Sequence, residues 1–360
     1  MTTTPPPPKP APDAVATQGV SLGQDAWRRL RKNRFAIGSM GFLGLLAVLA
    51  VLTPALPLQP PRRVDTRRQF QPPAVRPLVE PTFPSAEEGN APLETGFGRL
   101  GWFSQKLLAT RVALFGRWSV ASLCGTDNLG RDVLSRLFWG ARISLAVGLV
   151  AALVSLVIGV SYGAISGYFG GRVDNAMMRL VDILYSIPFI FLVIFVITIL
   201  SADEVKQRLA ALGIDRMVIF FAVVGAIYWL TMARVVRGQV LSLRNEPFVE
   251  AARALGASRR RIIFRHIVPN LLSVVLVYLT LTIPQVMLFE AFLSFLGLGV
   301  EPPDVSWGLL ANDGVVAITP VRIYWWLVVF PGLALSLTLL ALNTLGDGLR
   351  DALDPRMKHR

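Results

Sequence analysis

The sequence has little of what a catalytic, redox or metal-binding protein usually carries. Its 360 residues include one cysteine, Cys124, and two histidines, His266 and His359. A lone cysteine excludes an internal disulfide, and the chain has no cysteine–histidine spacing typical of a metal site. It also lacks a GxxxxGK[S/T] loop, the usual cradle for nucleotide phosphates. No nucleophile and base can be paired, so we expect no catalytic residue, metal or cofactor in this chain.

Charged residues are also scarce, at 16%, whereas hydrophobic residues make up 53%. The mean hydropathy of +0.54 is higher than a soluble domain tolerates. The net charge of +13 could indicate nucleic-acid binding. However, the Lys and Arg residues cluster beside apolar runs, where they orient membrane helices and contact anionic lipid. We therefore expect an all-α, polytopic membrane protein that contacts lipid and binds no nucleic acid.

Six apolar runs are close to the roughly 20 residues needed to cross a bilayer. They are Phe35–Leu56, Ile143–Ile165, Ile183–Leu200, Met217–Ala233, Leu271–Phe295 and Ile323–Leu345. Small residues in and just after the second run predict close helix packing; they are Gly148, Ser155, Gly159, Gly163 and Ser166. Prolines interrupt three later runs, which favours a multi-helix bundle; they are Pro188, Pro284 and Pro331.

The segments around these runs divide the chain. Residues 1–21 are rich in proline and are expected to be a disordered cytoplasmic tail. Residues 22–56 combine a basic segment with the first span, whose apolar run is longer than that of a signal peptide. Residues 57–138 are expected to form an extracytoplasmic insert, residues 139–347 the five-helix domain, and residues 348–360 a cytoplasmic C-terminus. The short connection Gly167–Asp182 would then also be cytoplasmic.

The most informative stretch is 246–270, a basic island between the fourth and fifth runs. Pro247 suits the first position of a short helix, with Asn245 or Glu246 as its cap. Gly256 would close that helix in a left-handed conformation. Ser258 would cap a second helix, Arg259–Val268, which the Pro269-Asn270 turn would end.

The arginine triplet in this stretch allows two interpretations. Arg259, Arg260 and Arg261 could be a topogenic cluster facing anionic headgroups. Alternatively, they could be part of a docking surface for another protein. They would lie in the first helical turn, where the helix dipole slightly disfavours cations.

The same stretch resembles the EAA loop of ABC importer permeases, and its RHIVPN ending is similar to the peptide and nickel branch. In that family the loop is cytoplasmic and forms a coupling helix seated in a groove of the ATPase subunit. The resemblance therefore implies a set of ATPase-coupling residues. They are Glu250, Ala251, Ala252, Gly256, Arg259, Arg260, Arg261, His266 and Pro269.

A second motif, GTDNLGRD, precedes the second run. From the residues alone it is a turn leading into an amphipathic interfacial helix, with Val133, Leu134, Leu137 and Phe138 on one face. It also resembles an outer signature of the same permeases, which implies a place near a docked substrate-binding protein. The residues concerned are Gly125, Thr126, Asp127, Gly130, Arg131 and Asp132.

Further stretches, Gly167–Pro188, Phe292–Gly308 and Leu345–Arg356, also look like the C-type permease of these importers. The resemblance, from about Trp27 to Arg356, implies a type I ABC importer permease with six transmembrane helices in a bacterial inner membrane. It implies a B-type permease partner, two ATPase subunits that bind ATP and Mg, and an extracytoplasmic binding protein. Di- or oligopeptides are the expected cargo, with nickel or another small solute as the alternative.

The main rival from another class is an ion-coupled secondary carrier, which would need inverted repeats and intramembrane charges. A membrane anchor or assembly factor is a second rival. The acidic residues Asp182 and Glu290 are expected near helix ends, where water or headgroups reach them.

Overall fold

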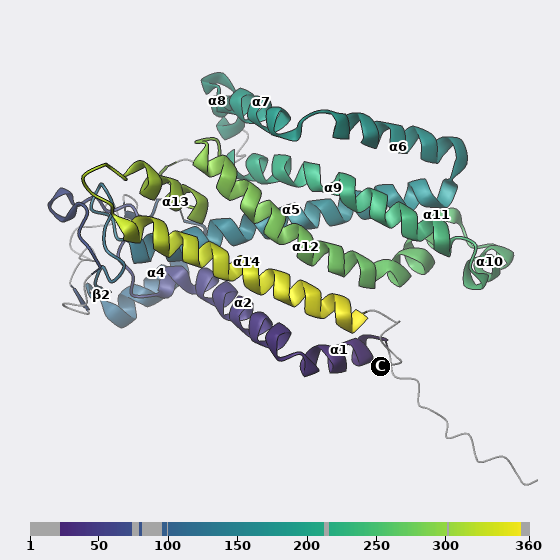
Figure 1. Ribbon diagram of the computed structural model, residues 1–360, viewed down its shortest axis with the longest axis horizontal. Coiled ribbons are helices and arrows are strands. Elements are labelled where there is room, and N and C mark those ends of the chain that lie inside the picture. The colour runs from purple at the N-terminus through teal and green to yellow at the C-terminus, as the bar shows by residue number, and fades with distance from the viewer. Residues whose placement is uncertain are drawn as a thin grey trace, which may run out of the picture.

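The chain runs back and forth along one long axis, as Figure 1 shows. This computed structural model describes residues 22–73, 79–80, 96–98, 100–211, 216–300 and 302–353. The predicted tail, residues 1–21, and the last residues of the predicted C-terminus, 354–360, lie outside these ranges. The long elements are α2 (Arg34–Leu52), α5 (Val133–Phe169), α6 (Gly171–Ser186), α7 (Phe189–Ser201), α9 (Arg216–Leu243), α12 (Val268–Phe295) and α14 (Trp325–Leu353).

Shorter elements cap the two ends of this bundle. They are α1 (Leu22–Lys32), η1 (Thr53–Ala55), η2 (Thr66–Arg68), α4 (Trp102–Phe115), α8 (Asp203–Ala211), α10 (Pro247–Ala254), α11 (Arg259–Arg261), η4 (Ile262–Ile267) and α13 (Trp307–Val316). Two short strands, β1 (Val79–Glu80) and β2 (Ser119–Val120), pair antiparallel. The predicted all-α class is therefore confirmed.

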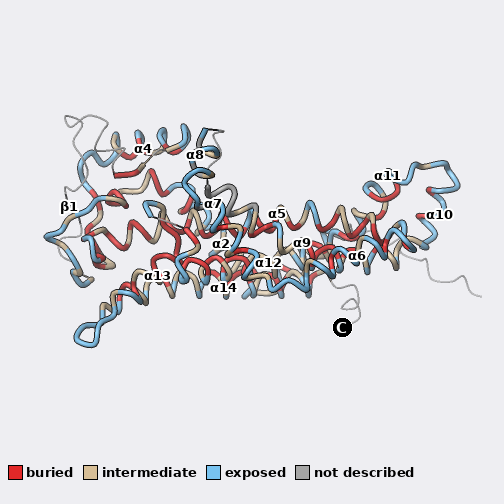
Figure 2. Tube along the Cα trace, turned by 90° about the horizontal axis from the view of Figure 1, so that it is seen from above, coloured by how far each residue is buried: buried red, intermediate tan, exposed pale blue. Residues whose placement is uncertain are grey.

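The two ends of the bundle differ in composition. Figures 1 and 2 place α4, α13 and the strand pair at one end, called here the α4 end. They place α10 and α11 at the other, called here the α10 end. Figure 1 shows α1 towards this end, where the last turns of α14 pack on it. The basic segment before the first span thus lies at the same end as the 246–270 stretch, as the charge pattern predicts. Which side of the membrane each end faces remains a prediction.

Among the described residues, four helical stretches are long and apolar enough to cross a membrane. They are Arg34–Ala55, Val133–Phe169, Arg259–Phe295 and Trp325–Leu353. The pair Gly171–Ser186 and Phe189–Ile199, bent by 80°, adds a fifth if it counts as one span. The remaining expected span, Met217–Ala233, lies within α9. The chain is therefore a multi-pass protein, and the count of six spans remains a prediction.

Helix α5 corrects two expectations. It is one unbroken helix of 37 residues, so the amphipathic turns after Asp132 and the second span are not separate elements. The expected connection Gly167–Asp182 is also wrong, because α5 continues to Phe169 and α6 begins at Gly171. Gly170 alone joins them, with a φ of +64° that side-chain-bearing residues rarely adopt.

Proline acts differently in the three interrupted runs. At Pro188 the helix breaks, because α6 ends at Ser186 and α7 begins after the proline at an angle of 80°. The other two, Pro284 and Pro331, lie inside α12 and α14 and are buried. Neighbouring helices therefore surround the carbonyl groups that lose their hydrogen-bond donor because proline has no N–H group.

Close packing of α5 on α9 forms the centre of the bundle. A Cβ atom on Gly159 would lie 2.6 Å from Met232 Cβ. On Gly163 it would lie 2.3 Å from the Ala233 carbonyl oxygen, and on Gly167 it would lie 2.8 Å from the Arg237 carbonyl oxygen. The glycines recur every four residues and so lie on one face of α5. This confirms the predicted small-residue packing, in which the missing side chains let two backbones approach.

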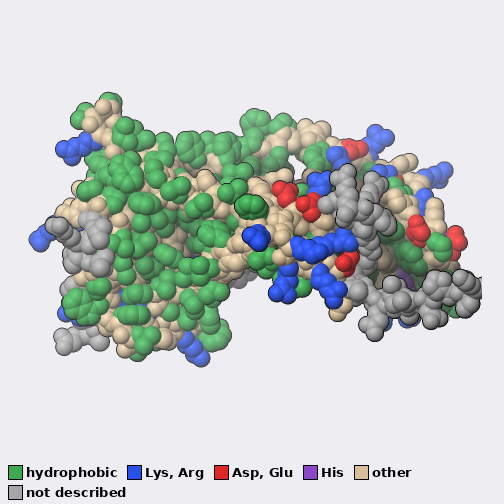
Figure 3. All heavy atoms as spheres, turned by 60° about the horizontal axis from the view of Figure 1, so that its bottom comes forward, with side chains coloured by type: hydrophobic (Ala, Val, Ile, Leu, Met, Phe, Trp, Pro, Cys, Tyr) green, Lys and Arg blue, Asp and Glu red, His purple; other side chains and the backbone are tan. Residues whose placement is uncertain are grey.

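The outer faces of α2 and α14 remain apolar. Figure 3 shows hydrophobic side chains over most of the face that these helices present, with basic side chains gathered towards the α10 end. The exposed residues include Phe42, Leu45, Val48, Leu333, Leu337 and Leu340. A surface of this kind needs lipid or another apolar partner to cover it.

Candidate functional site

A helical projection at the α10 end carries the predicted coupling residues. Helix α10 begins at Pro247 after Glu246 and ends at Ala254. The chain then turns at Gly256, whose φ is +78°. This confirms the predicted glycine-closed helix, because the left-handed conformation needed there is one that glycine adopts without strain.

One face of α10 anchors the projection to the bundle. Val249 and Ala252 are buried in a hydrophobic cluster with Ile262, Ile263 and Ile267. The same cluster includes residues of α5, α9 and α12. Of the predicted coupling residues, Ala252 therefore packs inward and holds α10 in place. A small side chain is needed there because the position is enclosed.

The second predicted helix differs from its expected form. Ser258 caps it as predicted, with its Oγ accepting a hydrogen bond from the Arg261 amide at 3.4 Å. However, no turn occurs at Pro269: α11 leads into a π-helical turn, η4, and then directly into α12. The whole stretch Arg259–Phe295 is one helical span.

The wide turn before Pro269 has a local physical reason. Proline has no amide hydrogen, and its ring clashes with the carbonyl one helical turn earlier. In η4 the helix widens, and the Val268 amide bonds to the Ile263 carbonyl five residues back. The Asn270 side-chain Nδ2 donates to the His266 carbonyl at 2.6 Å. The helix therefore accommodates Pro269 by widening, where the sequence predicted that it would end.

The outward face of the projection is available to a partner. Glu250, Ala251 and Gly256 are exposed, and Leu255 at the tip is 88% exposed. Phe248 is partly exposed beside them. Sequence reasoning missed Leu255 and Phe248, although a leucine beside a helix-ending glycine in a polar stretch is a signal that could have found Leu255. Exposed apolar residues surrounded by polar ones are typical of protein contact sites.

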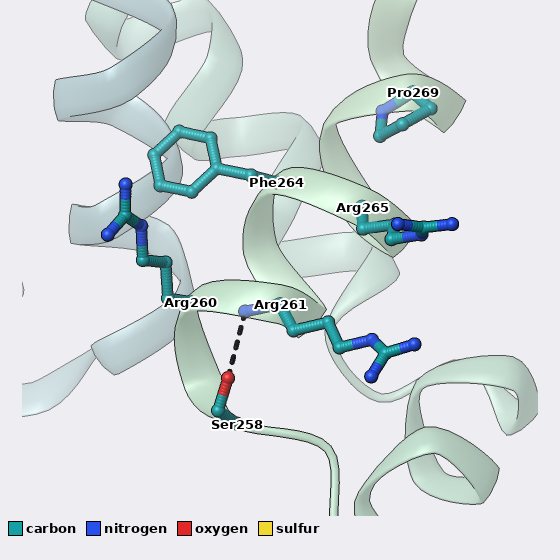
Figure 4. A pocket seen from close by; sticks show the side chains of 6 residues that line it. All are labelled: Ser258, Arg260, Arg261, Phe264, Arg265 and Pro269. Carbon is teal, nitrogen blue, oxygen red and sulfur yellow. Dashed lines mark hydrogen bonds between the residues drawn. The ribbon is translucent and has the colours of Figure 1, made fainter.

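The arginines of the stretch do not form one patch. The Arg259 guanidinium lies over the Phe169 ring at 5.5 Å, and that of Arg253 over the Tyr168 ring at 5.4 Å. Both therefore tie the projection to the end of α5. Figure 4 shows a shallow open hollow lined by Ser258, Arg260, Arg261, Phe264, Arg265 and Pro269. In that view Arg261 and Arg265 point to one side, and Arg260 points away from them.

The GTDNLGRD motif lies at the α4 end and forms a buried charge network. Asp127 accepts hydrogen bonds from the amides of Leu129 and Arg131, both at 2.9 Å. Its other oxygen accepts from Arg131 Nε at 2.7 Å and from Arg136 Nη1 at 2.6 Å. The buried Arg136 also bonds to Asp313 of α13 at 3.2 Å. Removing one partner would leave a buried charge uncompensated.

Burial determines what this motif can do. Thr126, Asp127 and Asp132 are each at most 3% exposed. A Cβ on Gly130 would overlap the Asp65 carbonyl oxygen at 1.8 Å, so the turn packs directly on the preceding segment. The motif therefore builds the α4 end, and only Asn128 and Leu129 are exposed in it. A place near a binding protein remains a prediction for these two residues and their surroundings.

Asp132 gives this end of the molecule a pH dependence. It precedes α5, and its Oδ2 accepts from the Ser135 amide at 2.8 Å. Burial raises the pKa of Asp132 from 3.8 to about 7, and hydrogen bonds to the carboxylate oppose the rise only in part. Between these two values the folded protein holds a proton that the unfolded chain releases. This contribution to stability is therefore present at low pH and lost as the pH rises towards 7.

We expect Asp132→Asn to flatten that dependence. The asparagine keeps a side-chain oxygen for the Ser135 amide but cannot titrate. Thermal unfolding of the detergent-purified chain, followed from pH 4.5 to 7.5, should show a falling midpoint in the parent and a smaller fall in the variant. Asn128→Asp, an exposed change in the same loop, serves as the control. Equal slopes in parent and Asp132→Asn would contradict the assignment.

Of the two acidic residues predicted near helix ends, one has the expected exposure and the other does not. Asp182 is 63% exposed and pairs with Arg234 at 2.7 Å, as expected for a charge near a helix end. The prediction that water or headgroups reach Glu290 is wrong, because the residue is fully buried. Its carboxyl group accepts a hydrogen bond from Ser294 Oγ at 2.7 Å. Sequence reasoning also missed Asp174, which accepts two hydrogen bonds from Arg237. Within the described ranges, no cluster of three or more His, Cys, Asp or Glu side chains could hold a metal ion.

Comparison with known proteins gives two family matches. Residues 159–359 match the family described as binding-protein-dependent transport system inner membrane component. Residues 21–73 match the N-terminal transmembrane domain of oligopeptide transport permease C. Together the two matches include the first span, the projection and most of the bundle.

Individual relatives extend the match over nearly the whole chain. The dipeptide transport system permease protein of Bacillus subtilis is 38% identical over 346 residues, which is 96% of this chain and 89% of that protein. Its namesake from Lactococcus lactis is 34% identical over 96% of this chain and 93% of its own length. The oligopeptide transport system permease protein of Haemophilus influenzae is 49% identical over 64% of this chain and 70% of its own.

Proposed function

Because this chain belongs to the binding-protein-dependent transport system inner membrane components, we propose that it is the C-type permease subunit of an ATP-driven importer of di- or oligopeptides. The named relatives are permeases of dipeptide and oligopeptide transport systems. With a B-type permease, this chain would form the translocation pathway in a bacterial inner membrane. ATP hydrolysis would take place in two separate ATPase subunits, and an extracytoplasmic binding protein would deliver the peptide.

The α10 projection is the observation that carries this proposal. Its outward face offers Glu250, Ala251 and Leu255, while its inward face is buried against α5, α9 and α12. A partner that moves α10 therefore also moves the bundle. The projection shares its end of the molecule with α1 and the end of α14. In our proposal this end is cytoplasmic, with both chain termini on that side.

Force would pass from the ATPase into the bundle along two routes. The first is the hydrophobic cluster that joins Val249 and Ala252 to α5 and α9. The second is the covalent continuity from α11 through η4 into α12. Closure of the ATPase pair on ATP would displace α10, and α12 would move with it as one piece. Such a change between outward- and inward-facing states is a rigid-body switch biased from a distant site.

An ion-coupled carrier would use intramembrane charges to move its cargo. Asp174 and Asp182 are each paired with an arginine of α9, and Glu290 bonds to Ser294. These groups therefore have structural roles in the bundle. Import of nickel or another small solute would use the same architecture, and the identity of the binding protein's ligand decides between the cargoes.

Co-purification from detergent tests the proposal. The tagged chain, expressed with its neighbouring transporter subunits, should retain a nucleotide-binding subunit. In proteoliposomes, peptide uptake should require ATP and the peptide-loaded binding protein, and a protonophore should leave it unchanged. Uptake driven by an ion gradient without ATP would overturn the proposal, as would a chain that never retains an ATPase.

A further inference from the structure

A cavity at the α4 end has no part in the coupling proposed above. It has a volume of about 390 Å³ and lies between the start of α4, the first turns of α5 and the segment 303–305. Its lining combines aromatic, aliphatic and charged side chains. One side of the cavity is lined by residues of the range 57–138, which was predicted as an insert without an assigned role; they are Pro61, Arg62, Phe97, Leu100, Gly101 and Ser104.

Among the described residues that line this cavity, the charged side chains are two arginines and one aspartate. Arg62 Nη2 bonds to Asp304 Oδ1 at 3.0 Å, which balances one cation with one anion. Arg142 Nη2 donates to Ser104 Oγ at 3.0 Å, and its guanidinium lies 5.0 Å from the Trp139 ring centroid. In the part of the chain that the structure describes, no carboxylate pairs with Arg142. Its remaining donors suit an anion, which a guanidinium binds with two parallel hydrogen bonds.

The cavity is graded from polar to apolar along α5. Trp139, Arg142, Ile143 and Ala146 all line it and share one face of the helix, because they are spaced three and four residues apart. Trp139 and Arg142 lie in the first third of the candidate span Val133–Phe169, towards the α4 end. Tryptophan and arginine at this position are typical of the membrane–water interface. The positions that follow towards the middle of this span, Ile143 and Ala146, are apolar.

Helix α4 has the surface of a helix that lies on a membrane. Trp102 and Leu114 are 69% and 70% exposed, and Phe103, Phe115 and Trp118 are exposed as well. Lys106 lies 4.9 Å from the Trp102 ring centroid. The opposite face is held on the protein through buried Ser104, Leu108 and Arg111. Exposed aromatic residues with an adjacent cation fit the interfacial layer of a bilayer.

We propose that this cavity binds the headgroup of an anionic phospholipid from the leaflet at the α4 end. The phosphate would accept hydrogen bonds from Arg142, with Arg62 beside it. The first acyl carbons would lie along Ile143 and Ala146. The one excess positive charge among the described lining residues matches a headgroup with a single negative charge, and the apolar floor distinguishes a lipid from a soluble anion.

Native mass spectrometry of the full-length, detergent-purified chain tests this proposal. Phosphatidylglycerol and phosphatidylcholine are titrated separately against the parent, Arg142→Gln, Arg142→Lys and Arg117→Gln. Arg117 is exposed just after α4 and is the matched control. We expect phosphatidylglycerol to bind Arg142→Gln about tenfold more weakly, the loss expected for one charge-assisted hydrogen bond. Arg142→Lys should restore part of the affinity, and Arg117→Gln should bind as the parent does.

A second variant separates lipid binding from general damage and from soluble anions. Ala146→Phe fills the apolar floor and keeps both arginines, so it should also weaken phosphatidylglycerol binding. Glycerol 3-phosphate and a dipeptide, each offered without lipid, should not bind measurably. The proposal would be overturned if phosphatidylcholine bound as well as phosphatidylglycerol, or if Arg117→Gln lost as much affinity as Arg142→Gln. It would also be overturned if Ala146→Phe were unaffected, or if either soluble compound bound in a way that depends on Arg142.

Discussion

Glu250→Lys is expected to abolish peptide-stimulated ATP hydrolysis by the assembled transporter while leaving the chain folded in the membrane. Glu250 is exposed on α10, and the anchoring contacts come from Val249 and Ala252 on the other face. Charge reversal therefore changes only the surface that, in our proposal, contacts the ATPase. Loss of one partner of a desolvated charge pair at an interface costs about 2–5 kcal/mol. We therefore expect coupled hydrolysis in proteoliposomes to fall by about thirtyfold or more.

A matched control lies at the opposite end of the molecule. Glu204 on α8 is also exposed, and Glu204→Lys makes the same change in charge far from α10. Its coupled ATPase rate should equal that of the parent. Gly256→Pro is a second test of the projection, because proline cannot adopt the φ of +78° found at this turn. Normal coupling in both Glu250→Lys and Gly256→Pro would disprove docking through α10.

Gly163→Val should prevent α5 and α9 from packing. The new Cβ would lie 2.3 Å from the Ala233 carbonyl oxygen, which belongs to the backbone and cannot rotate away. The two helices would have to separate, and overpacking of a core usually costs about 1–3 kcal/mol and occasionally more. We expect a loss of at least about 3 kcal/mol in the free energy of unfolding. Unfolding of the purified chain by SDS titration, followed by circular dichroism, measures it.

Gly238→Val is the control for this substitution. Gly238 lies on α9, and a Cβ there would meet no atom within 4 Å. Its effect should be limited to the small differences in helix propensity between the two residues. If Gly163→Val and Gly238→Val unfold at the same SDS concentration as the parent, the close approach of α5 to α9 is incorrect.

Much of this architecture could be predicted because its signals are local. The apolar runs gave the long helices, the small residues of the second run gave its close packing on a neighbour (though not which neighbour), and Pro188 gave the bend. The α10 helix followed from Pro247 and Gly256. In each case the residues that determine the feature are neighbours in the sequence, so their spacing is sufficient evidence.

The errors concern features that depend on distant residues. Proline was expected to end a helix at Pro269, yet the cluster around Ile262, Ile263 and Ile267 holds the chain helical across it. Glu290 was expected to reach water, but the elements packed around α12 bury it completely. Asp313 joins Arg136 across 177 positions. Spacing along one helix carries no information about such partners.

The network around Asp127 shows the same limit for the candidate sites. The motif could be recognised from the sequence, and its aspartates and arginine could be named. The burial of the aspartates could not be predicted. An exposed signature and an internal ion network have the same residue types in sequence. Only the contacts with Arg136 and Asp313 show that these charges hold α5 and α13 together.

The widened turn η4 also sets a rotational phase. A π-turn contains more residues than an α-turn, and each residue of an α-helix advances the side-chain direction by about 100°. The residues Ile262–Ile267 thus determine which face of α12, the one that carries Val286 and Leu293, packs against α5. Deleting one residue from this turn would leave α12 as apolar as before. It would, however, rotate every side chain of α12 about the helix axis, away from its present neighbours.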